Sequence, residues 1–519
     1  MSFFKVAVRF GCAIAAISLT AAPAAAQSTE DIGVELLQLL VDEGLIPLEK
    51  AQSLLDRARR NAEVRTQREA TATASTTIDV PYVPEALRNQ IRDEVKAEVV
   101  AQAKSERWIA PGTLPAWLDG VKLSGDFRMR YQSTMFADGN FPAFPDVNAI
   151  LQAGGVSRTD FPLLNTTDNF HQLRYRARLG VEAQVSDKVK LGFRLASGED
   201  NGPIATNDII GDNFRKDAIY IDRAYLELQP IKQATLIAGR MPNPFYSTDL
   251  VWDVDVNMEG LAAKLSYDFG DDLLGARLFA NGGYFPLQEK ETDGIERYLL
   301  AGQGGVSIRP VDDVELQFAG AYYDFKNLQG RRNAPDGARI NDHTAPMALA
   351  RGNSLFDIRT DGLTSLPGLA SRFELLNFTG HVAYRGFGDI GVKLTGDYVV
   401  NLGFDQSEIA ALRVGEPGSV PPDNNGYQIR LDVGHDEIRK FGDWQFAAAY
   451  KRVDTDAVVD IFTHSEFGLG GTDVKGYLIR GRLGLLPNTY IGANWYSTKS
   501  IASAPLDVDV LQIDLGARF

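Results

Sequence analysis

A long segment with a two-residue period is the feature that most constrains the fold of this chain. From Leu173 to Val185 apolar side chains occupy every second position, and mostly polar or charged ones stand between them. A strand in a soluble sheet typically has about five or six residues, whereas a tilted strand that crosses a bilayer needs about nine to eleven. The segment therefore predicts a membrane-crossing strand with one face toward lipid and one toward water.

The same period recurs to the last residue of the chain. It predicts sixteen strands, an even number, over residues 121–133, 170–185, 189–198, 218–229, 234–241, 257–267, 274–284, 298–309, 314–325, 373–385, 390–400, 426–435, 444–453, 474–485, 489–499 and 508–519.

The connections between these strands alternate between short and long, and the longest covers residues 326–372. Short turns at one rim and long loops at the other are typical of an antiparallel up-and-down barrel in an outer membrane. Closure pairs every strand edge, as lipid requires. The predicted fold class is all-β: a transmembrane barrel of about sixteen strands, preceded by short periplasmic α-helices.

Composition excludes other classes of protein. The chain has 519 residues and a net charge of −15, which argues against a nucleic-acid partner, because such a surface needs clustered Lys and Arg. Beyond the N-terminus no apolar run approaches eighteen residues, so a helical membrane protein is excluded. The single cysteine, Cys12, lies in the N-terminal leader, so we expect no disulfide in the mature chain.

The N-terminal residues predict export. Lys5 and Arg9 precede a short apolar stretch and then small residues ending at Ala26, the pattern of a cleaved signal peptide. Together with the barrel, this predicts the outer membrane of a Gram-negative bacterium. We expect a signal peptide at 1–26, a helical hairpin at 27–62, linkers at 63–83 and 109–120, an amphipathic helix at 84–108, and the barrel at 121–519.

The amphipathic helix leaves two interpretations open. It could form a periplasmic stalk that contacts the cell wall or makes oligomers, or it could pack on the main domain. At the other end of the chain, apolar residues occupy every second position from Leu511 to Phe519. A terminal strand that ends in Phe is similar to the signal that the barrel-assembly machinery recognises, so we expect Phe519 to serve this role.

Three segments resemble one known family, the bacterial putative porins of the outer membrane: Val83–Val95, Leu123–Arg130 and Ala238–Phe245. The resemblance covers nearly the whole mature chain. It implies a water-filled channel in outer-membrane lipid for passive diffusion of small hydrophilic solutes and ions, and it leaves a homotrimer open. It implies no particular solute.

The polar phase of several strands is rich in basic residues. In a closed barrel the last strand is the neighbour of the first, so these residues should form one basic wall that lines a pore. The predicted wall consists of Lys122, Arg128, Arg130, Arg174, Arg176, Arg178, Lys190, Arg194, Arg480, Arg482 and Arg518.

The connection after the fifth strand carries candidate partners for this wall: Asp249, Asp253, Asp255 and Glu259. By analogy with general porins, in which the third loop folds inward, these acids could form a constriction with a transverse field. The alternative is a solvated outer loop. Asp253, Asp255 and Glu259 share the parity of Leu261, which should face lipid, so the constriction needs a bulge near Gly260 or a loop conformation up to it.

No motif predicts an enzyme, a cofactor or a metal. Residues 386–391 match G-x-G-x-x-G but lie in a turn between strands, with no helix to follow. Residues 253–257 resemble the start of a calcium loop, but Met258 and Lys264 stand where Gly and Glu are needed. The alternatives to a pore are a barrel enzyme of the lipase or protease type and a plugged uptake receptor.

Overall fold

The computed structural model describes residues 120–198, 202–204, 206–211, 213–270, 274–289, 296–414, 418 and 420–519. The chain divides into two compact units, residues 1–108 and 109–519. The expected signal peptide, helical hairpin, amphipathic helix and both linkers up to residue 119 lie outside the described residues. The expected barrel at 121–519 lies in the second unit.

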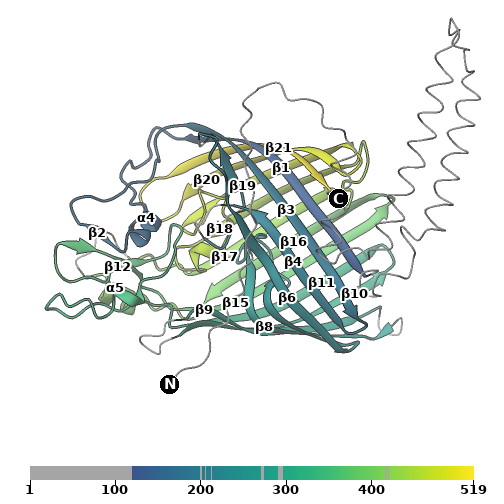
Figure 1. Cartoon of the computed structure of the whole chain (residues 1–519), viewed down its shortest axis with the longest axis horizontal. Coiled ribbons are helices and arrows are strands. Elements are labelled where there is room, and N and C mark those ends of the chain that lie inside the picture. Colours follow the sequence, from purple (N-terminus) through teal and green to yellow (C-terminus); the bar gives the residue numbers. More distant parts are fainter. Residues whose placement is uncertain are drawn as a thin grey trace, which may run out of the picture. The chain divides into compact units, whose positions relative to one another are not determined.

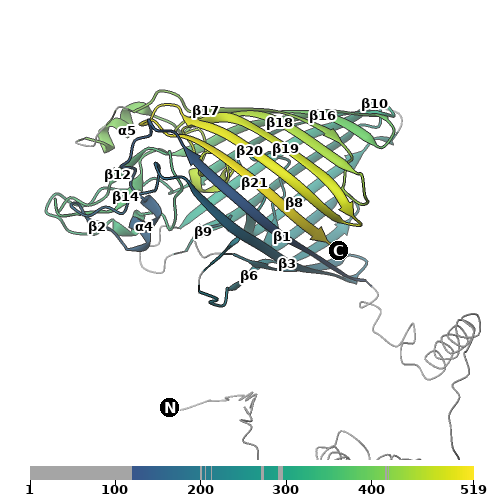
Figure 2. The same cartoon turned by 90° about the horizontal axis from the view of Figure 1, so that it is seen from above.

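Sixteen long strands form one closed antiparallel ring, in which each strand pairs with its neighbours along the chain (Figures 1 and 2). They are β1 (Val121–Phe136), β3 (Phe170–Ser186), β4 (Val189–Ser197), β6 (Ile219–Ile231), β7 (Ala234–Pro242), β8 (Asn257–Asp268), β9 (Arg277–Gln288), β10 (Arg297–Val311), β11 (Val314–Lys326), β15 (Phe373–Phe387), β16 (Ile390–Asn401), β17 (Asn425–Gly434), β18 (Trp444–Val453), β19 (Val474–Leu486), β20 (Thr489–Ser500) and β21 (Asp507–Arg518).

The ring closes where the last strand meets the first. β1 pairs with β3 on one side and with β21 on the other. Backbone hydrogen bonds between Gly125 and Phe519, at 3.0 and 3.1 Å, extend this pairing to the final residue. The predicted all-β barrel and all sixteen strands are confirmed; the largest shift of a boundary is at the end of β9, which lies at Gln288 instead of 284.

The two rims differ as the spacing predicts. Tight turns and the C-terminus occupy one end, and the long connections occupy the other (Figure 1). The long connections carry short elements: α4 (Val147–Gln152), β2 (Val156–Ser157), β5 (Asp208–Ile210), η2 (Asp342–Thr344), β12 (Leu355–Asp357), β13 (Thr364–Ser365), β14 (Pro367–Leu369), α5 (Gln406–Leu412) and η3 (Asp460–Phe462).

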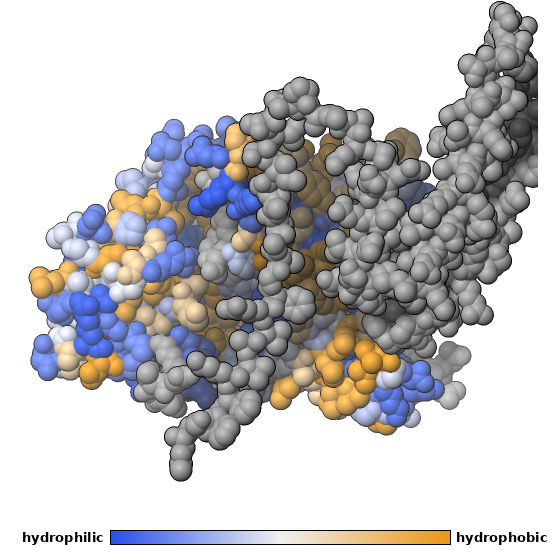
Figure 3. Space-filling model, viewed as in Figure 1, coloured by the Kyte–Doolittle hydropathy of each residue, from blue (hydrophilic) through white to orange (hydrophobic). Residues whose placement is uncertain are grey.

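The outer face of the strands is apolar. Leu123, Leu261 and Leu515 expose 65, 61 and 51% of their surface, respectively, and their neighbours at the next position face inward. Where Figure 3 leaves the barrel wall uncovered, hydrophobic residues gather on it, with hydrophilic residues beyond them at the turn end. Within the described residues, no helix has the length and apolarity needed to cross a bilayer.

The interior of the barrel has two different halves. Buried apolar side chains of β9, β10, β11 and β15 pack against the connection at 243–256, and buried polar side chains such as Asn281 and Gln303 lie among them. Phe245 and Trp252 of this connection contact Tyr323 of β11 edge-on, with ring centres 5.3 and 5.4 Å apart. On β19, β20, β21, β1, β3 and β4, the inward side chains are largely polar or charged. A second polar cavity, of about 680 Å³, lies on the side of β7–β11 and is lined by Lys264, Arg309 and Glu315 among others.

Two glycines on β19 provide a test of the strand pairing. A Cβ atom at Gly476 would lie 2.1 Å from the carbonyl oxygen of Ser497, whereas a Cβ at Gly481 would have no atom of the described chain within 4 Å. We expect Gly476→Val to lower the free energy of unfolding by roughly 1–3 kcal/mol, because overpacking forces the backbone to move. Gly481→Val should be nearly neutral. Heat-dependent electrophoretic mobility of the folded barrel measures both, and equal effects would contradict this register.

Candidate functional site: a charged cavity beside two inward loops

The connection between β7 and β8, residues 243–256, lies inside the barrel. The backbone N–H of Tyr246 donates to Gln303 of β10 at 2.8 Å, and the Tyr246 hydroxyl lies 2.6 Å from Nδ1 of His381 on β15. The hydroxyl of Thr248 donates to Asp397 of β16 at 2.5 Å. The segment is therefore held against the barrel wall and is not a solvated outer loop.

A second connection, residues 454–473 between β18 and β19, packs on the first. Thr463 Oγ1 donates to the carbonyl oxygen of Leu250 at 2.9 Å, and both N–H and hydroxyl of Ser465 donate to Asp253 at 2.9 Å. Lys451 Nζ donates to Asp249 at 2.9 Å beneath this contact. The two inward loops thus support each other across the lumen.

A cavity of about 610 Å³ lies between these loops and the opposite wall. Its charged lining combines ten arginines with five acids. They are Arg128, Arg130, Arg176, Arg178, Arg194, Arg223, Arg430, Arg480, Arg482 and Arg518, with Asp126, Asp249, Asp253, Asp255 and Glu466.

Eight of the eleven basic residues singled out from the sequence line this cavity: Arg128, Arg130, Arg176, Arg178, Arg194, Arg480, Arg482 and Arg518. Three do not. Lys122 is exposed near the turn end of β1, Lys190 forms an ion pair with Glu227 at 2.8 Å, and Arg174 lies toward the loop end of β3.

Three of the four candidate acids, Asp249, Asp253 and Asp255, lie in the inward loop and line the same cavity. Because they precede β8, strand parity does not apply to them, which removes the conflict with Leu261. Glu259 is different: it belongs to β8, pairs with Arg240 of β7 and is 58% exposed. Glu259 therefore is not among the loop acids that face the arginines.

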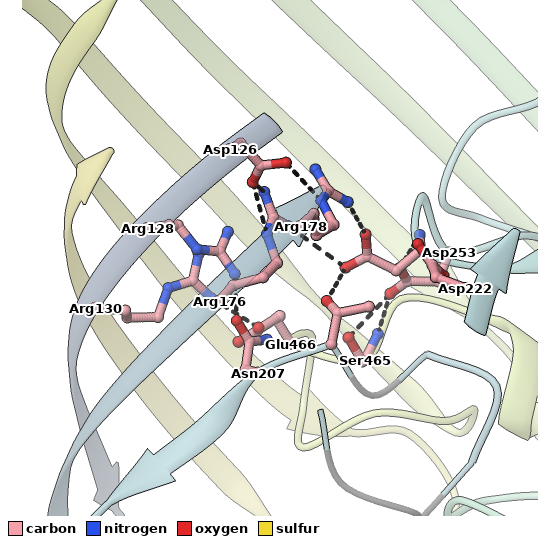
Figure 4. Close-up of polar contacts among 12 residues, drawn as sticks. Asp126, Arg128, Arg130, Arg176, Arg178, Asn207, Asp222, Asp253, Ser465 and Glu466 are labelled. Carbon is pink, nitrogen blue, oxygen red and sulfur yellow. Dashed lines mark hydrogen bonds and ion pairs between the residues drawn. The ribbon is translucent and has the colours of Figure 1, made fainter. Parts of the chain in front are cut away.

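Many of the arginines form ion pairs with carboxylates within the wall and the loop. Asp126 accepts from Arg176 at 2.8 Å and from Arg178 at 2.6 Å, and dashed lines in Figure 4 mark both contacts. Arg178 also reaches Asp255 at 3.1 Å. The predicted wall is therefore not uniformly basic, because acidic residues are built into it.

The most buried of these pairs centres on Arg130, which is only 5% exposed. It contacts Asp514 of β21 at 2.6 Å and Glu466 of the second loop at 2.7 Å. Burial would raise the pKa of the Glu466 carboxyl, but Arg130, Arg174 and Arg128 outweigh this effect and lower it. Glu466 is thus anionic and ties the second loop to the wall.

The loop junction shifts the pKa of its titratable groups. Burial raises the pKa of Asp253 to about 6, with a further contribution from Asp255. Burial lowers the pKa of His464 to about 4, and Asp249 only partly opposes this effect. Burial would also raise the pKa of Asp249, but Lys451 and His464 together lower it. At neutral pH the His464 ring is therefore neutral. It lies 3.2 Å from both the Lys451 ammonium and the Asp249 carboxylate, which form an ion pair with each other.

Several residues of the site escaped the sequence analysis. Arg430 and Lys451 follow the same strand parity as the predicted wall, so extending the count to β17 and β18 would have found them. Glu466 and His464 lie in a connection without periodicity, and no local signal identifies them. Among the described residues, no group of three or more His, Cys, Asp or Glu side chains is arranged to hold a metal ion.

A closed barrel with an apolar outer face and a charged cavity inside defines a membrane protein of the pore-forming class. Comparison with known proteins specifies it further: residues 30–519 match the family described as Putative porin, and the chain belongs to this family. It is accordingly an outer-membrane channel protein of Gram-negative bacteria. No curated protein matched the sequence.

Solved structures of similar shape are outer-membrane porins and channels. The complex of Salmonella typhi OmpF with daunomycin has 10% identity and a TM-score of 0.42, covering 78% of this chain and all of the other. Pseudomonas putida OprB has 11% identity and a TM-score of 0.44, covering 79 and 96%. Acinetobacter baumannii DcaP has 10% identity and a TM-score of 0.38, covering 77 and 98%. The family assignment rests on the family match alone.

The first prediction from the site concerns Arg130. We expect Arg130→Ala to lower the free energy of unfolding by roughly 3–5 kcal/mol, because it leaves two carboxylates buried without their cation. Arg277→Ala is the control, since its pair with Asp268 is exposed and such pairs contribute about 0–1 kcal/mol. Urea unfolding in detergent measures both; similar losses would refute the role of Arg130.

The second prediction concerns His464. Its folded-state pKa of about 4 lies below the ordinary 6.5, so the stability that it contributes is present above pH 6.5 and is lost as the pH falls toward 4. The free energy of unfolding of the wild type should fall between pH 7 and pH 4.5. In His464→Gln we expect this fall to be smaller by an amount on the order of 2 kcal/mol. His171→Gln, at an exposed position of β3, should follow the wild type. A wild-type profile in His464→Gln would contradict the prediction.

Proposed function

We propose that the protein forms a water-filled channel for passive diffusion of small hydrophilic solutes and ions, narrowed between the inward loop 243–256 and the wall formed by β19–β21, β1, β3 and β4. The observation that carries this proposal is the charged cavity of about 610 Å³ beside that loop. Sixteen strands enclose a lumen wide enough for an aqueous path.

The charge arrangement supports selection by polarity. Arginines of the wall face Asp249, Asp253 and Asp255 of the loop, and opposed charges of this kind order water and favour polar or charged solutes over apolar ones of equal size. We further propose that Lys122, Arg174 and Lys190 belong to the polar face of the same path, above and below the cavity.

Other properties remain proposals that the sequence motivates. We propose that residues 1–26 are a signal peptide, that the helices expected at 27–62 and 84–108 contact the cell wall, and that the C-terminal strand ending in Phe519 is bound by the barrel-assembly machinery. We also propose a homotrimer embedded in outer-membrane lipid, no cofactor, and no enzymatic activity; lipase and protease assays of the purified protein test the last point.

The channel itself is tested by reconstituting the purified protein in planar lipid bilayers. We expect discrete conductance steps, together with liposome swelling by sugars, phosphate and organic acids at rates that fall with solute size. Heat-unfolded protein in the same detergent is the control. A folded protein that gave neither steps nor swelling would refute the proposal.

A further inference from the structure

Ten arginines line the cavity, and nine of them fall into two groups. The tenth, Arg223 of β6, donates to Asn257 at 2.7 Å and lies outside the strands β1 and β19 that carry the second group. The first group forms ion pairs with carboxylates that belong to the fold. Its members are Arg130 with Asp514 and Glu466, Arg176 and Arg178 with Asp126 and Asp255, Arg194 with Asp222, Arg430 with Asp432, and Arg518 with Glu437. Because each of these arginines has an acidic partner, the group contributes to holding loops and strands together more than to attracting a solute.

The second group consists of Arg128, Arg480 and Arg482, which we name the open arginines. Within the described part of the chain, none of these guanidinium groups forms an ion pair, and their direct contacts are with neutral side chains. Asp514 and Glu466 act on them only at longer range. Arg128 Nη2 donates to Asn207 at 2.5 Å, and Arg480 Nε donates to Asn494 at 2.9 Å. The Arg482 guanidinium lies 5.2 Å from the centre of the Tyr490 ring.

The Arg128 guanidinium is buried, and one of its hydrogen-bond donors has no acceptor among the described residues. Arg128 is only 9% exposed, and its Nε atom is buried and finds no hydrogen-bond acceptor among the described residues. A buried donor without an acceptor is costly, and the nearest acids that act on Arg128, Glu466 and Asp514, are already paired with Arg130. The site is therefore one that an anion would stabilise.

Strand register brings the open arginines to one hollow. Arg482 of β19 pairs with Gly492 of β20, and Arg128 of β1 pairs with Gly516 of β21. Gly516 in turn pairs with Tyr490, whose ring lies over it: a Cβ at Gly516 would come within 2.5 Å of the ring. Because Gly516 has no side chain, the Tyr490 ring packs on it, and the Arg482 guanidinium lies over that ring. Arg128, opposite Gly516 on β1, lines the same cavity.

We propose that this hollow is a binding site for small, multiply charged anions, of the dicarboxylate or phosphate type. Guanidinium groups bind carboxylate and phosphate through two parallel hydrogen bonds, and three of them beside one cavity can engage more than one anionic group. The carboxylates of the inward loop lie across the cavity and repel the same anion, which restricts it to the arginine side. The inference rests on the proposed channel, since the site lies on its path.

The test uses the full-length protein in planar bilayers with potassium chloride as the carrier of current. Phosphate or citrate added to one side should reduce the chloride current in a saturable way, while the same ionic strength of chloride should not. In the double variant Arg480→Gln/Arg482→Gln, we expect the half-blocking concentration to rise about tenfold. The double variant Arg480→Lys/Arg482→Lys retains both charges, so we expect it to be blocked more strongly than the glutamine double variant. It also shows whether the two positions tolerate substitution.

Arg277→Gln is the matched control, because Arg277 lies on β9 away from the open arginines and pairs with Asp268. It should leave the block unchanged. A conducting wild type without saturable block, or a glutamine double variant that is blocked like the control, would overturn the anion site and leave the channel intact. A folded protein without conductance would instead refute the proposed function.

Discussion

Every structural feature of this protein depends on the requirement that backbone polar groups in lipid be paired within the protein. An unpaired N–H or C=O in the hydrocarbon region costs several kcal/mol, so an open sheet edge is excluded. The chain meets this requirement by pairing β1 with β21 and by extending the pairing to Phe519. Once the ring is closed, the outward positions must be apolar, and the polar residues of every strand are confined to the interior.

That confinement creates the problem that the inward loops solve. A sixteen-strand barrel encloses more space than its own side chains fill. Loops 243–256 and 454–473 occupy part of it, and they do so asymmetrically: their apolar residues pack on β9–β11, and their carboxylates meet the arginines of the opposite wall. Hydrophobic burial fixes one side of the loops, and ion pairs such as Arg130 with Glu466 fix the other.

The sequence was sufficient for the barrel because a two-residue period reports which face of a strand is buried, independently of its partners. Strand count, order and inward arginines all follow from parity. The loop site was harder to predict. The sequence identified Asp253 and Asp255 by residue type and by their place after the fifth strand. The same reasoning placed Glu259 in the loop, whereas it lies within β8. Glu466 and His464 were missed because their positions depend on tertiary contacts of an aperiodic segment.

Parity also could not divide the arginines by role. Arg176 and Arg128 occupy adjacent strands in the same register and face the same cavity, yet Asp126 neutralises the first and an asparagine contacts the second. Because Coulomb energies rise steeply as water is excluded, a paired arginine mainly rigidifies the wall, whereas an open one leaves net positive potential in the path. Selectivity should therefore be governed by the few open arginines and not by the total count of basic residues, and the net negative charge of the whole chain gives no guide to it.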